Sequence, residues 1–172
     1  METKIFPDDR WVDLGLPSGI LWAKYNVGAT SPEEYGEYYA WGETETKSSY
    51  TNENYKYYNS ATDSYTHIGD DISGTQYDVA HVKWGNGARM PRFADIQELL
   101  DKCSWSVSTY NGVKGMTVTG QNGNSMFLPF AGYLSYDEFF GGGYYGCSWS
   151  GTYSEEYGDA LNLDFYDDGY RD

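Results

Sequence analysis

The chain has 172 residues, and its 11 Lys and Arg against 26 Asp and Glu give a formal net charge of −15 at pH 7. This charge repels phosphate backbones and anionic lipids, so we expect neither nucleic-acid binding nor binding to an anionic membrane surface. The length favours one domain over residues 1–172, with enough chain to bury a core without metals or disulfides.

Aromatic residues make up 19% of the chain, including 19 Tyr, beside 21 Gly. Tyr suits a half-exposed strand, because its ring packs while its hydroxyl stays in water. The mixture of Tyr, Gly, Ser and Asn is also typical of recognition surfaces, since Tyr offers a large rigid contact area at low entropic cost. Both interpretations are open at this point.

The sequence carries no sign of a membrane or export segment. No stretch approaches the roughly 18 apolar residues of a membrane span, and the first residues lack the apolar segment of a secretory signal. We therefore expect no membrane insertion and no signal peptide in this chain.

The first third of the chain predicts a hairpin and a short helix. In Trp11–Ala23, two apolar stretches flank a Pro-Ser-Gly turn, which indicates a β-hairpin. Ser31 and Glu34 are spaced as a capping box, so we expect a short helix that ends before Gly36. Tyr38–Gly42 then reads as extended chain.

Residues 43–74 are rich in Thr, Ser, Asn, Tyr and Asp and predict a long loop excursion, which in a compact domain is usually functional or mobile. Asp70, Asp71 and Asp78 do not have the spacing of an EF-hand loop, so a solvated acidic face is favoured over a calcium site. His81 has no second His near it in the sequence, and we expect it to pack structurally.

The strongest helix signal covers Arg89–Cys103. Apolar residues recur at helical spacing from Phe93 through Ile96 and Leu99 to Cys103, and charged residues occupy the opposite side. We therefore expect an amphipathic helix whose apolar face packs on a sheet.

Short strand patterns follow the helix. Trp105–Ser108, Gly115–Thr119 and Ser125–Tyr133 predict an antiparallel meander, with a hairpin turn at Asn111-Gly112. Ala160–Phe165 alternates between apolar and polar residues, which indicates one buried and one solvent-facing side.

Residues 141–151 form a glycine-rich loop that leads into a strand. The loop lacks the Gly-Lys-Ser/Thr ending of a P-loop, so it predicts no phosphate site. Cys103 and Cys147 are far apart and form no Cys-x-x-Cys motif, so we expect neither a zinc site nor any other metal or cofactor. Cys103 is expected to be a buried thiol, and Cys147 is either free or its disulfide partner.

Several short motifs occur in order along the chain: Trp11–Gly19, Asn26–Ala29, Ser31–Gly36, Tyr39–Thr44, Asp78–Ala80, Arg89–Pro91, Phe127–Pro129 and Trp149-Ser150. In this order they resemble the Fibrobacter succinogenes major paralogous domain, a family that is abundant in Bacteroidetes proteins, often exported ones. The resemblance covers nearly the whole chain. It implies a location at the cell surface or outside the cell.

The Arg89–Pro91 element before a helix and the Trp149-Ser150 strand are also similar to the formylglycine-generating-enzyme branch of the C-type-lectin-like fold. This resemblance implies an α+β domain with twisted antiparallel sheets, two helices and long loops. The chain departs from the family at Ala88, where members have Trp, and at Gly151, where members have a second Ser.

The family's closing C-terminal strand, Gly-x-x-Val-Arg-Pro-Val, is missing from this chain. Without it the last sheet position would be empty or filled by another segment or another molecule. An open strand edge invites pairing with a second chain. A homo-oligomer formed through this edge is therefore one hypothesis.

The C-terminal third predicts a ligand-binding face, because a Tyr/Gly/Asp-rich loop region there combines aromatic rings with acidic acceptors. The candidate residues are Tyr136, Asp137, Phe139, Tyr144, Tyr145, Tyr153, Glu155, Tyr157, Asp167, Asp168 and Tyr170. The predicted function is a non-catalytic recognition or adhesion module whose ligand is a glycan or a protein.

Two other classes of function are alternatives to this prediction. One is a structural or assembly subunit of a surface or phage-like particle. The other is a divergent enzyme of the formylglycine-generating type, which is disfavoured because Cys103 and Cys147 do not form a close pair that could hold copper. The nucleophile motif Gly-x-Ser-x-Gly is also absent from the sequence, so we do not expect an enzyme.

Overall fold

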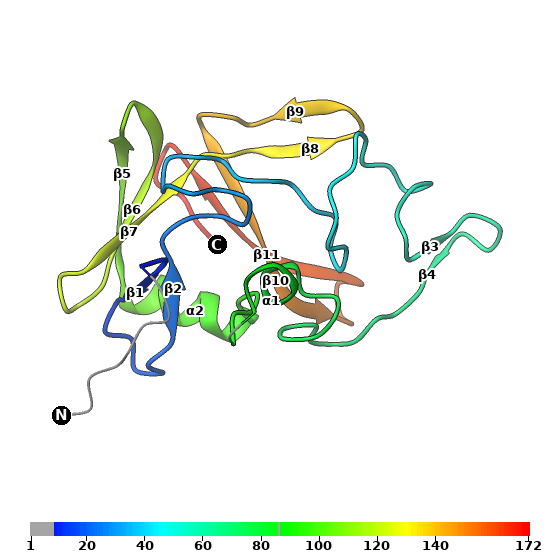
Figure 1. Ribbon diagram of the computed structural model, residues 1–172, viewed down its shortest axis with the longest axis horizontal. Helices are drawn as coiled ribbons and strands as arrows, with labels where there is room; N and C mark the ends of the chain where they lie inside the picture. The colour runs from blue at the N-terminus through cyan, green and yellow to red at the C-terminus, as the bar shows by residue number, and fades with distance from the viewer. Residues whose placement is uncertain (1–8, 86) are drawn as a thin grey trace.

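The computed structural model describes residues 9–85 and 87–172. Within these residues the chain forms an α+β arrangement of two helices and antiparallel strand pairs (Figure 1). The elements are β1 (Trp11–Asp13), β2 (Leu21–Ala23), β3 (Tyr58–Asn59), β4 (Ser64–Tyr65), α1 (Val79–Trp84), α2 (Phe93–Lys102), β5 (Ser104–Tyr110), β6 (Val113–Thr119), β7 (Ser125–Pro129), β8 (Tyr133–Ser135), β9 (Glu138–Phe140), β10 (Tyr145–Ser154) and β11 (Asp159–Tyr166).

Two predicted strand groups are confirmed. β1 and β2 pair as an antiparallel hairpin, and β5, β6 and β7 form an antiparallel meander. The predicted turn between β5 and β6 has positive φ at both central residues, 46° at Asn111 and 80° at Gly112. This is the geometry that matches the right-handed twist of the two strands.

The short helix predicted from Ser31 is wrong. Residues 31–34 make a single turn, in which the Glu34 N–H donates to the Ser31 carbonyl at 3.3 Å. The Glu34 carboxylate does reach back to accept the Thr30 N–H at 2.7 Å. However, Gly36 follows at a φ of +78°, outside the helical region, so the turn cannot extend into a helix.

The second helix is instead α1, and the buried Asp78 begins it. The Asp78 carboxylate accepts the N–H of His81 at 2.9 Å, of Gly74 at 2.8 Å and of Met90 at 2.7 Å. The expectation of a solvated acidic face is therefore wrong for Asp78, whose side chain is fully buried. His81 packs structurally, with Nδ1 at 3.2 Å from the Ala88 carbonyl.

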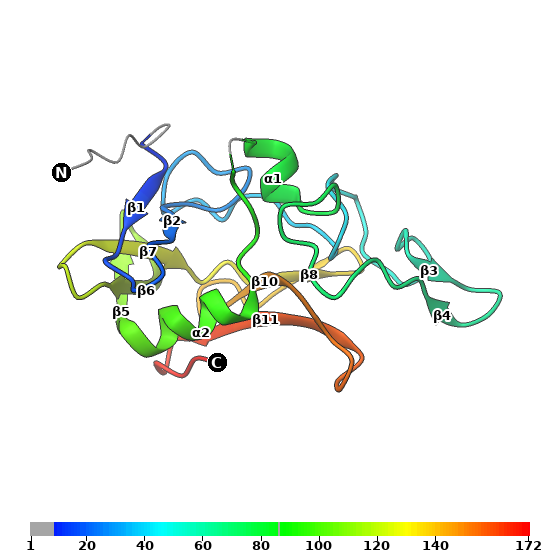
Figure 2. The ribbon, with the colours of Figure 1, turned by 90° about the horizontal axis from the view of Figure 1, so that it is seen from below.

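The amphipathic helix expected over 89–103 is confirmed as α2. Its first turn is capped by Asp95, whose carboxylate accepts the Arg92 N–H at 2.8 Å and pairs with the Arg89 guanidinium at 2.6 Å. Ile96 and Leu99 are fully buried. Figure 2 shows α2 along the β10–β11 hairpin and α1 on the other side of the molecule.

The apolar face of α2 divides between two core clusters. Leu99 packs in a cluster with residues of β1, β6 and β7, including Val118. Ile96 packs in a second cluster with Leu163 and Phe165 of β11. A single helix therefore joins the meander to the β10–β11 hairpin.

β10 and β11 form a long antiparallel hairpin, with a register shift between Trp149 and Tyr153. Leu163 and Phe165 are buried beneath it. Because side chains alternate along a strand, residues 145, 147 and 149 of β10 and residues 162, 164 and 166 of β11 lie on the opposite face. We call this the outer face of the hairpin.

Two glycines, one within β10 and one directly before β8, have a packing role. At Gly146, an added Cβ would lie 2.1 Å from Cζ of Phe165, so only glycine lets the ring pack directly under the strand. At Gly132, which pairs with Gly146, a Cβ would lie 2.0 Å from the Phe140 carbonyl oxygen. These glycines bring β8, β9 and β10 close together.

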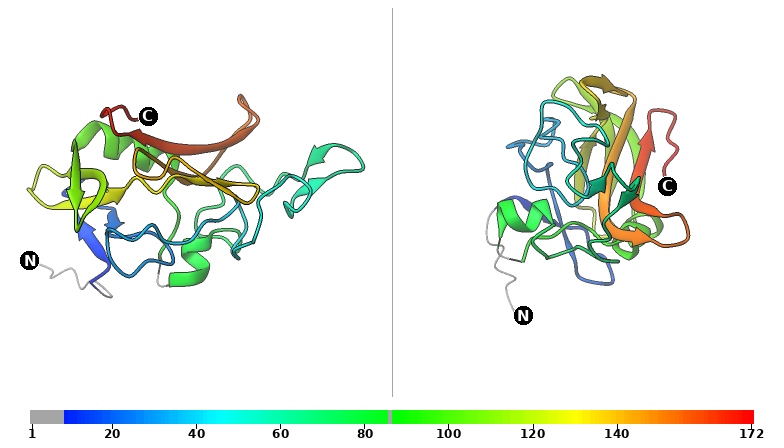
Figure 3. Two further views of the ribbon diagram at one scale, coloured as in Figure 1. Left: turned by 90° about the horizontal axis from the view of Figure 1, so that it is seen from above. Right: turned by 90° about the vertical axis from the view of Figure 1, so that its right-hand side faces the viewer.

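The last residues of the chain pair with β11. The Asp172 N–H and carbonyl exchange two hydrogen bonds with Asp164, at 3.0 and 2.9 Å, and the Tyr166 N–H donates to the Tyr170 carbonyl at 2.9 Å. The right-hand view of Figure 3 shows the C-terminus beside β11. Of the three alternatives for the last sheet position, filling by another segment of the chain is the one found at these positions of β11.

The long excursion predicted over residues 43–74 is confirmed. It is irregular apart from the small hairpin β3–β4, which stands away from the rest of the molecule in the left-hand view of Figure 3.

Replacing Asp78 tests the role of its buried carboxylate. Asp78→Ala leaves three backbone N–H groups without their acceptor, so we expect the free energy of unfolding in urea to fall by about 3 kcal/mol or more. Asp101→Ala, at an exposed position of α2, is the matched control and should change the free energy of unfolding by less than about 0.5 kcal/mol. Equal stability of the two variants would contradict this role.

Candidate functional site

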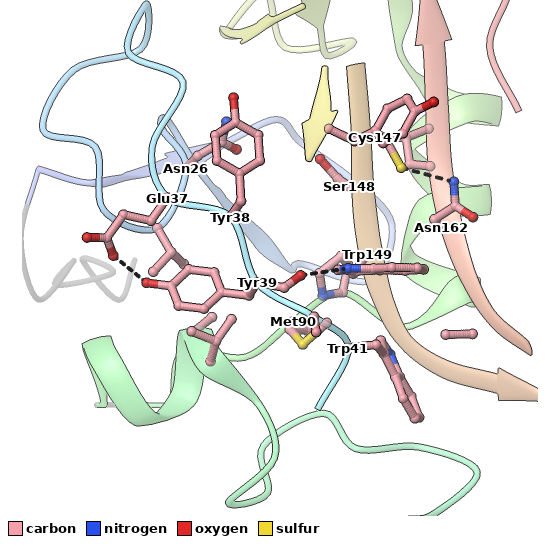
Figure 4. Close-up of a pocket in the computed structure, with 18 of the residues that line it drawn as sticks. Asn26, Glu37, Tyr38, Tyr39, Trp41, Met90, Cys147, Ser148, Trp149 and Asn162 are labelled. Atoms are coloured by element: carbon pink, nitrogen blue, oxygen red, sulfur yellow. Dashed lines mark hydrogen bonds between the residues drawn. The ribbon is translucent and has the colours of Figure 1, made fainter. Parts of the chain in front are cut away.

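The loop before residue 42 passes alongside β10, and a cleft of about 1320 Å³ lies along this junction (Figure 4). Trp41 ties the loop to β10, because its indole N–H donates to the Ser150 carbonyl at 2.8 Å. The Tyr38 hydroxyl donates to the Ala131 carbonyl at 2.7 Å. These two bonds hold the wall of the cleft in place.

Trp149 presents a fixed aromatic ring in the cleft. Its indole N–H donates to the Tyr39 carbonyl at 3.1 Å, as Figure 4 shows. The Tyr39 hydroxyl in turn donates to the Glu37 carboxylate. Despite this support Trp149 is 37% exposed, so its ring is both oriented by the protein and accessible to a ligand.

A polar network lies beside Trp149 on the outer face. Asn162 is the direct cross-strand partner of Trp149, and Asp164 is the partner of Cys147. The Asp164 Oδ1 accepts from Asn162 Nδ2 at 2.6 Å and from the Tyr145 hydroxyl at 2.6 Å. Asn162 Nδ2 also lies 3.4 Å from the Cys147 sulfur.

Burial and the network raise the pKa values of two of these groups. Burial, followed by the hydrogen bond to Asp164, raises the pKa of the Tyr145 hydroxyl well above its ordinary value. Burial raises the pKa of the Cys147 thiol to about 12. Both groups are therefore protonated at neutral pH, and the Cys147 sulfur is a weak acceptor of the Asn162 amide N–H rather than a thiolate nucleophile.

The two cysteines are not paired with each other. Cys147 lies on the outer face of the hairpin, whereas Cys103 is buried beside Leu99 and Val118 at the end of α2. Of the two alternatives for Cys147, a free thiol or a disulfide with Cys103, the structure shows the free thiol.

Chemically, the cleft combines one accessible indole face with carboxylate, amide and hydroxyl groups. Such a set suits a ligand with both apolar C–H surfaces and hydroxyl groups, because the ring packs against the former and the polar groups bond the latter. Among residues 9–85 and 87–172, no group of three or more His, Cys, Asp and Glu is placed to hold a metal ion. The same residues contain no helix long and apolar enough to cross a membrane.

The predicted site residues fall into three separate groups. Tyr136, Asp137 and Phe139 lie at or next to the β8–β9 turn, where the Phe139 ring packs 6.1 Å from the rings of Tyr35 and Tyr38. This group adjoins the wall of the cleft.

The other two groups lie at opposite ends of the β10–β11 hairpin. At one end, the structure brings together Tyr144, Tyr145, Asp167, Asp168 and Tyr170. At the other end lie Tyr153, Glu155 and Tyr157. Eight residues of extended strand separate the ends by roughly 26 Å, so the eleven residues do not form a single surface.

Sequence reasoning missed the residues at the middle of the hairpin. In the sequence, Trp149 belongs to a short motif, and Asn162 and Asp164 form the polar side of an alternating strand. The alternation of apolar and polar residues is the signal that could have found them. Polar residues on the exposed side of a strand are candidates for ligand contact when the neighbouring strand carries an aromatic residue on the same side.

No family model matches this chain, and neither a curated protein nor a solved structure matches it significantly.

The raised pKa of Cys147 predicts slow alkylation. In a Cys103→Ala variant, we expect iodoacetamide at pH 8 to modify Cys147 at least 100-fold more slowly in the folded protein than in urea, because the thiolate is scarce and the pKa returns to about 8.5 on unfolding. Mass spectrometry of quenched samples gives both rates. Equal rates in the two states would show that the folded thiol is neither buried nor perturbed.

Proposed function

We propose that this protein is a non-catalytic recognition module that binds a glycan in the cleft beside β10. The observation that carries the proposal is Trp149, whose ring is accessible while its indole N–H is held by the Tyr39 carbonyl. A fixed ring loses little conformational entropy when a ligand packs on it. The C-type-lectin-like assignment and a location at the cell surface or outside the cell are part of the same proposal.

A glycan fits the surroundings of Trp149 better than a protein does. The centre of a protein interface is depleted of charged side chains, whereas here Asn162, the cross-strand partner of Trp149, is hydrogen-bonded to the Asp164 carboxylate on the same face. A sugar offers C–H groups for the ring and hydroxyls for the carboxylate and amide. The acidic surroundings disfavour an anionic sugar.

The environment of the cysteines supports binding rather than catalysis. The Cys147 pKa of about 12 keeps the thiol protonated, and Cys103 is buried in the core cluster of Leu99 and Val118, to which Cys147 does not belong. The two sulfurs therefore do not form the pair that formylglycine-type oxidation requires.

Substitution of Trp149 tests the proposal. On an array of neutral and charged glycans, we expect the wild-type protein to bind neutral glycans and Trp149→Ala to bind them about tenfold more weakly. Trp149→Phe should keep part of the affinity, because it retains an aromatic face.

Tyr110→Ala is the matched control, because Tyr110 is a comparably exposed ring, 44%, at the end of β5. Its affinity should equal that of the wild type. A wild-type protein that binds no glycan, or a Trp149→Ala variant that binds as the wild type does, would refute the proposal.

A further inference from the structure

Five aromatic rings form a row across the molecule, from β9 through β8, β10 and β11 to the C-terminal turn. Successive ring centroids are 5.4 Å apart from Phe140 to Tyr133, 5.9 Å from Tyr133 to Tyr145, 4.9 Å from Tyr145 to Tyr166 and 5.8 Å from Tyr166 to Tyr170. We call these residues the aromatic row.

Strand register produces the row. Tyr133 and Phe140 are direct partners in the β8–β9 hairpin, and Tyr145 and Tyr166 are direct partners in the β10–β11 hairpin. The bridge between Gly132 and Gly146 joins the two hairpins side by side. The row therefore runs across the strands and passes about 13 Å from Trp149, which lies four residues along β10.

The row is held in place and is accessible at its two ends, while Tyr145 and Tyr166 in its middle are half-buried. Phe140, Tyr133 and Tyr170 are 40%, 44% and 57% exposed. The Tyr145 hydroxyl is fixed by Asp164 at 2.6 Å, and the Tyr170 hydroxyl donates to Asp172 at 3.0 Å. Aromatic surface left in water is unfavourable for folding, and apolar surface that gathers in one place marks a binding site.

The spacing and charge of the row indicate its ligand. Each step is close to the length of one pyranose unit in an extended chain, so successive sugars would meet successive rings. Acidic side chains, among them Asp164, Asp167, Asp168 and Asp172, lie on the same strand and turn as the last two rings. They accept hydrogen bonds from hydroxyl groups and repel anionic chains. One line of rings with acids beside it is narrower than the apolar centre of a protein interface, so it suits a glycan chain better than a protein surface.

We propose that the aromatic row binds a linear, uncharged glycan chain of several pyranose units that lies across β9, β8, β10 and β11. This inference rests on the proposed function, since it names the class of glycan that the module recognises. It adds a second subsite, separate from the ring of Trp149, that makes affinity depend on the length of the chain.

A length series tests the proposal. Linear gluco-, xylo- and manno-oligosaccharides of one to six units are titrated calorimetrically into the wild type and into Tyr133→Ala, Tyr170→Ala and Tyr133→Phe variants. For whichever of the three kinds of oligosaccharide binds, we expect the affinity of the wild type to rise at least tenfold between two and five sugar units. Tyr133→Ala and Tyr170→Ala should abolish most of that rise and leave binding of the dimer within about twofold of the wild type.

Tyr133→Phe keeps the ring and should bind as the wild type does, which separates loss of stacking from loss of folding. Urea unfolding of each variant checks its stability, and Tyr110→Ala is again the control.

Three outcomes would overturn the row as a chain-binding site: affinity that does not depend on length, a rise that survives both alanine substitutions, or tighter binding of polygalacturonate than of any neutral chain. In each of these the Trp149 site would stand if dimers still require Trp149. Absence of binding by every saccharide would instead refute the proposed function itself, as would capture of proteins alone on a protein array.

Discussion

The packing of α2 against one face of the β10–β11 hairpin is the interaction on which the rest of the structure depends. Ile96 contacts the same core as Leu163 and Phe165, and burial of each of these large side chains contributes about 1.5 to 3 kcal/mol. Because side chains alternate along a strand, burying this set commits the alternate set, including Trp149 and Asp164, to the outer face. The candidate site is thus a consequence of how the core is built.

Local patterns were sufficient to predict the elements that form that core. α2 and the β5–β7 meander follow from periodicity and turn residues, which depend only on neighbours in the sequence. The prediction of a helix at Ser31 is wrong because Gly36, two residues after Glu34, adopts a positive φ that ends the turn. The capping signal of Ser31 and Glu34 is therefore not followed by a helix. The helix α1 was not foreseen because its six residues are too few for a periodic pattern, and its stabilising group, the buried Asp78, bonds backbone that is distant in sequence.

The candidate site was predictable only in part, because it depends on register. The Tyr-rich composition of the C-terminal third pointed to aromatic rings on a surface, and Tyr145 and Tyr170 do belong to the aromatic row. Which rings become neighbours is decided by pairing between segments, and the shift after Trp149 changes that pairing within a single strand. Phe140 and Tyr133 enter the row only through the contact between Gly132 and Gly146, which no local pattern encodes.

The net charge of −15 and the exposed rings are best understood together. A row of accessible aromatic side chains on adjacent strands is a hazard for self-association, and like charge on every copy of the chain counteracts it. Acids of this kind border the rings near Tyr170, where they would reject an anionic ligand and accept hydroxyl groups. If the row binds a glycan as proposed, solubility and ligand selectivity depend on one surface. Neutralising Asp167 or Asp168 would weaken both solubility and ligand selectivity. Neutralising an acid remote from the row, such as Asp101 on α2, would weaken solubility alone.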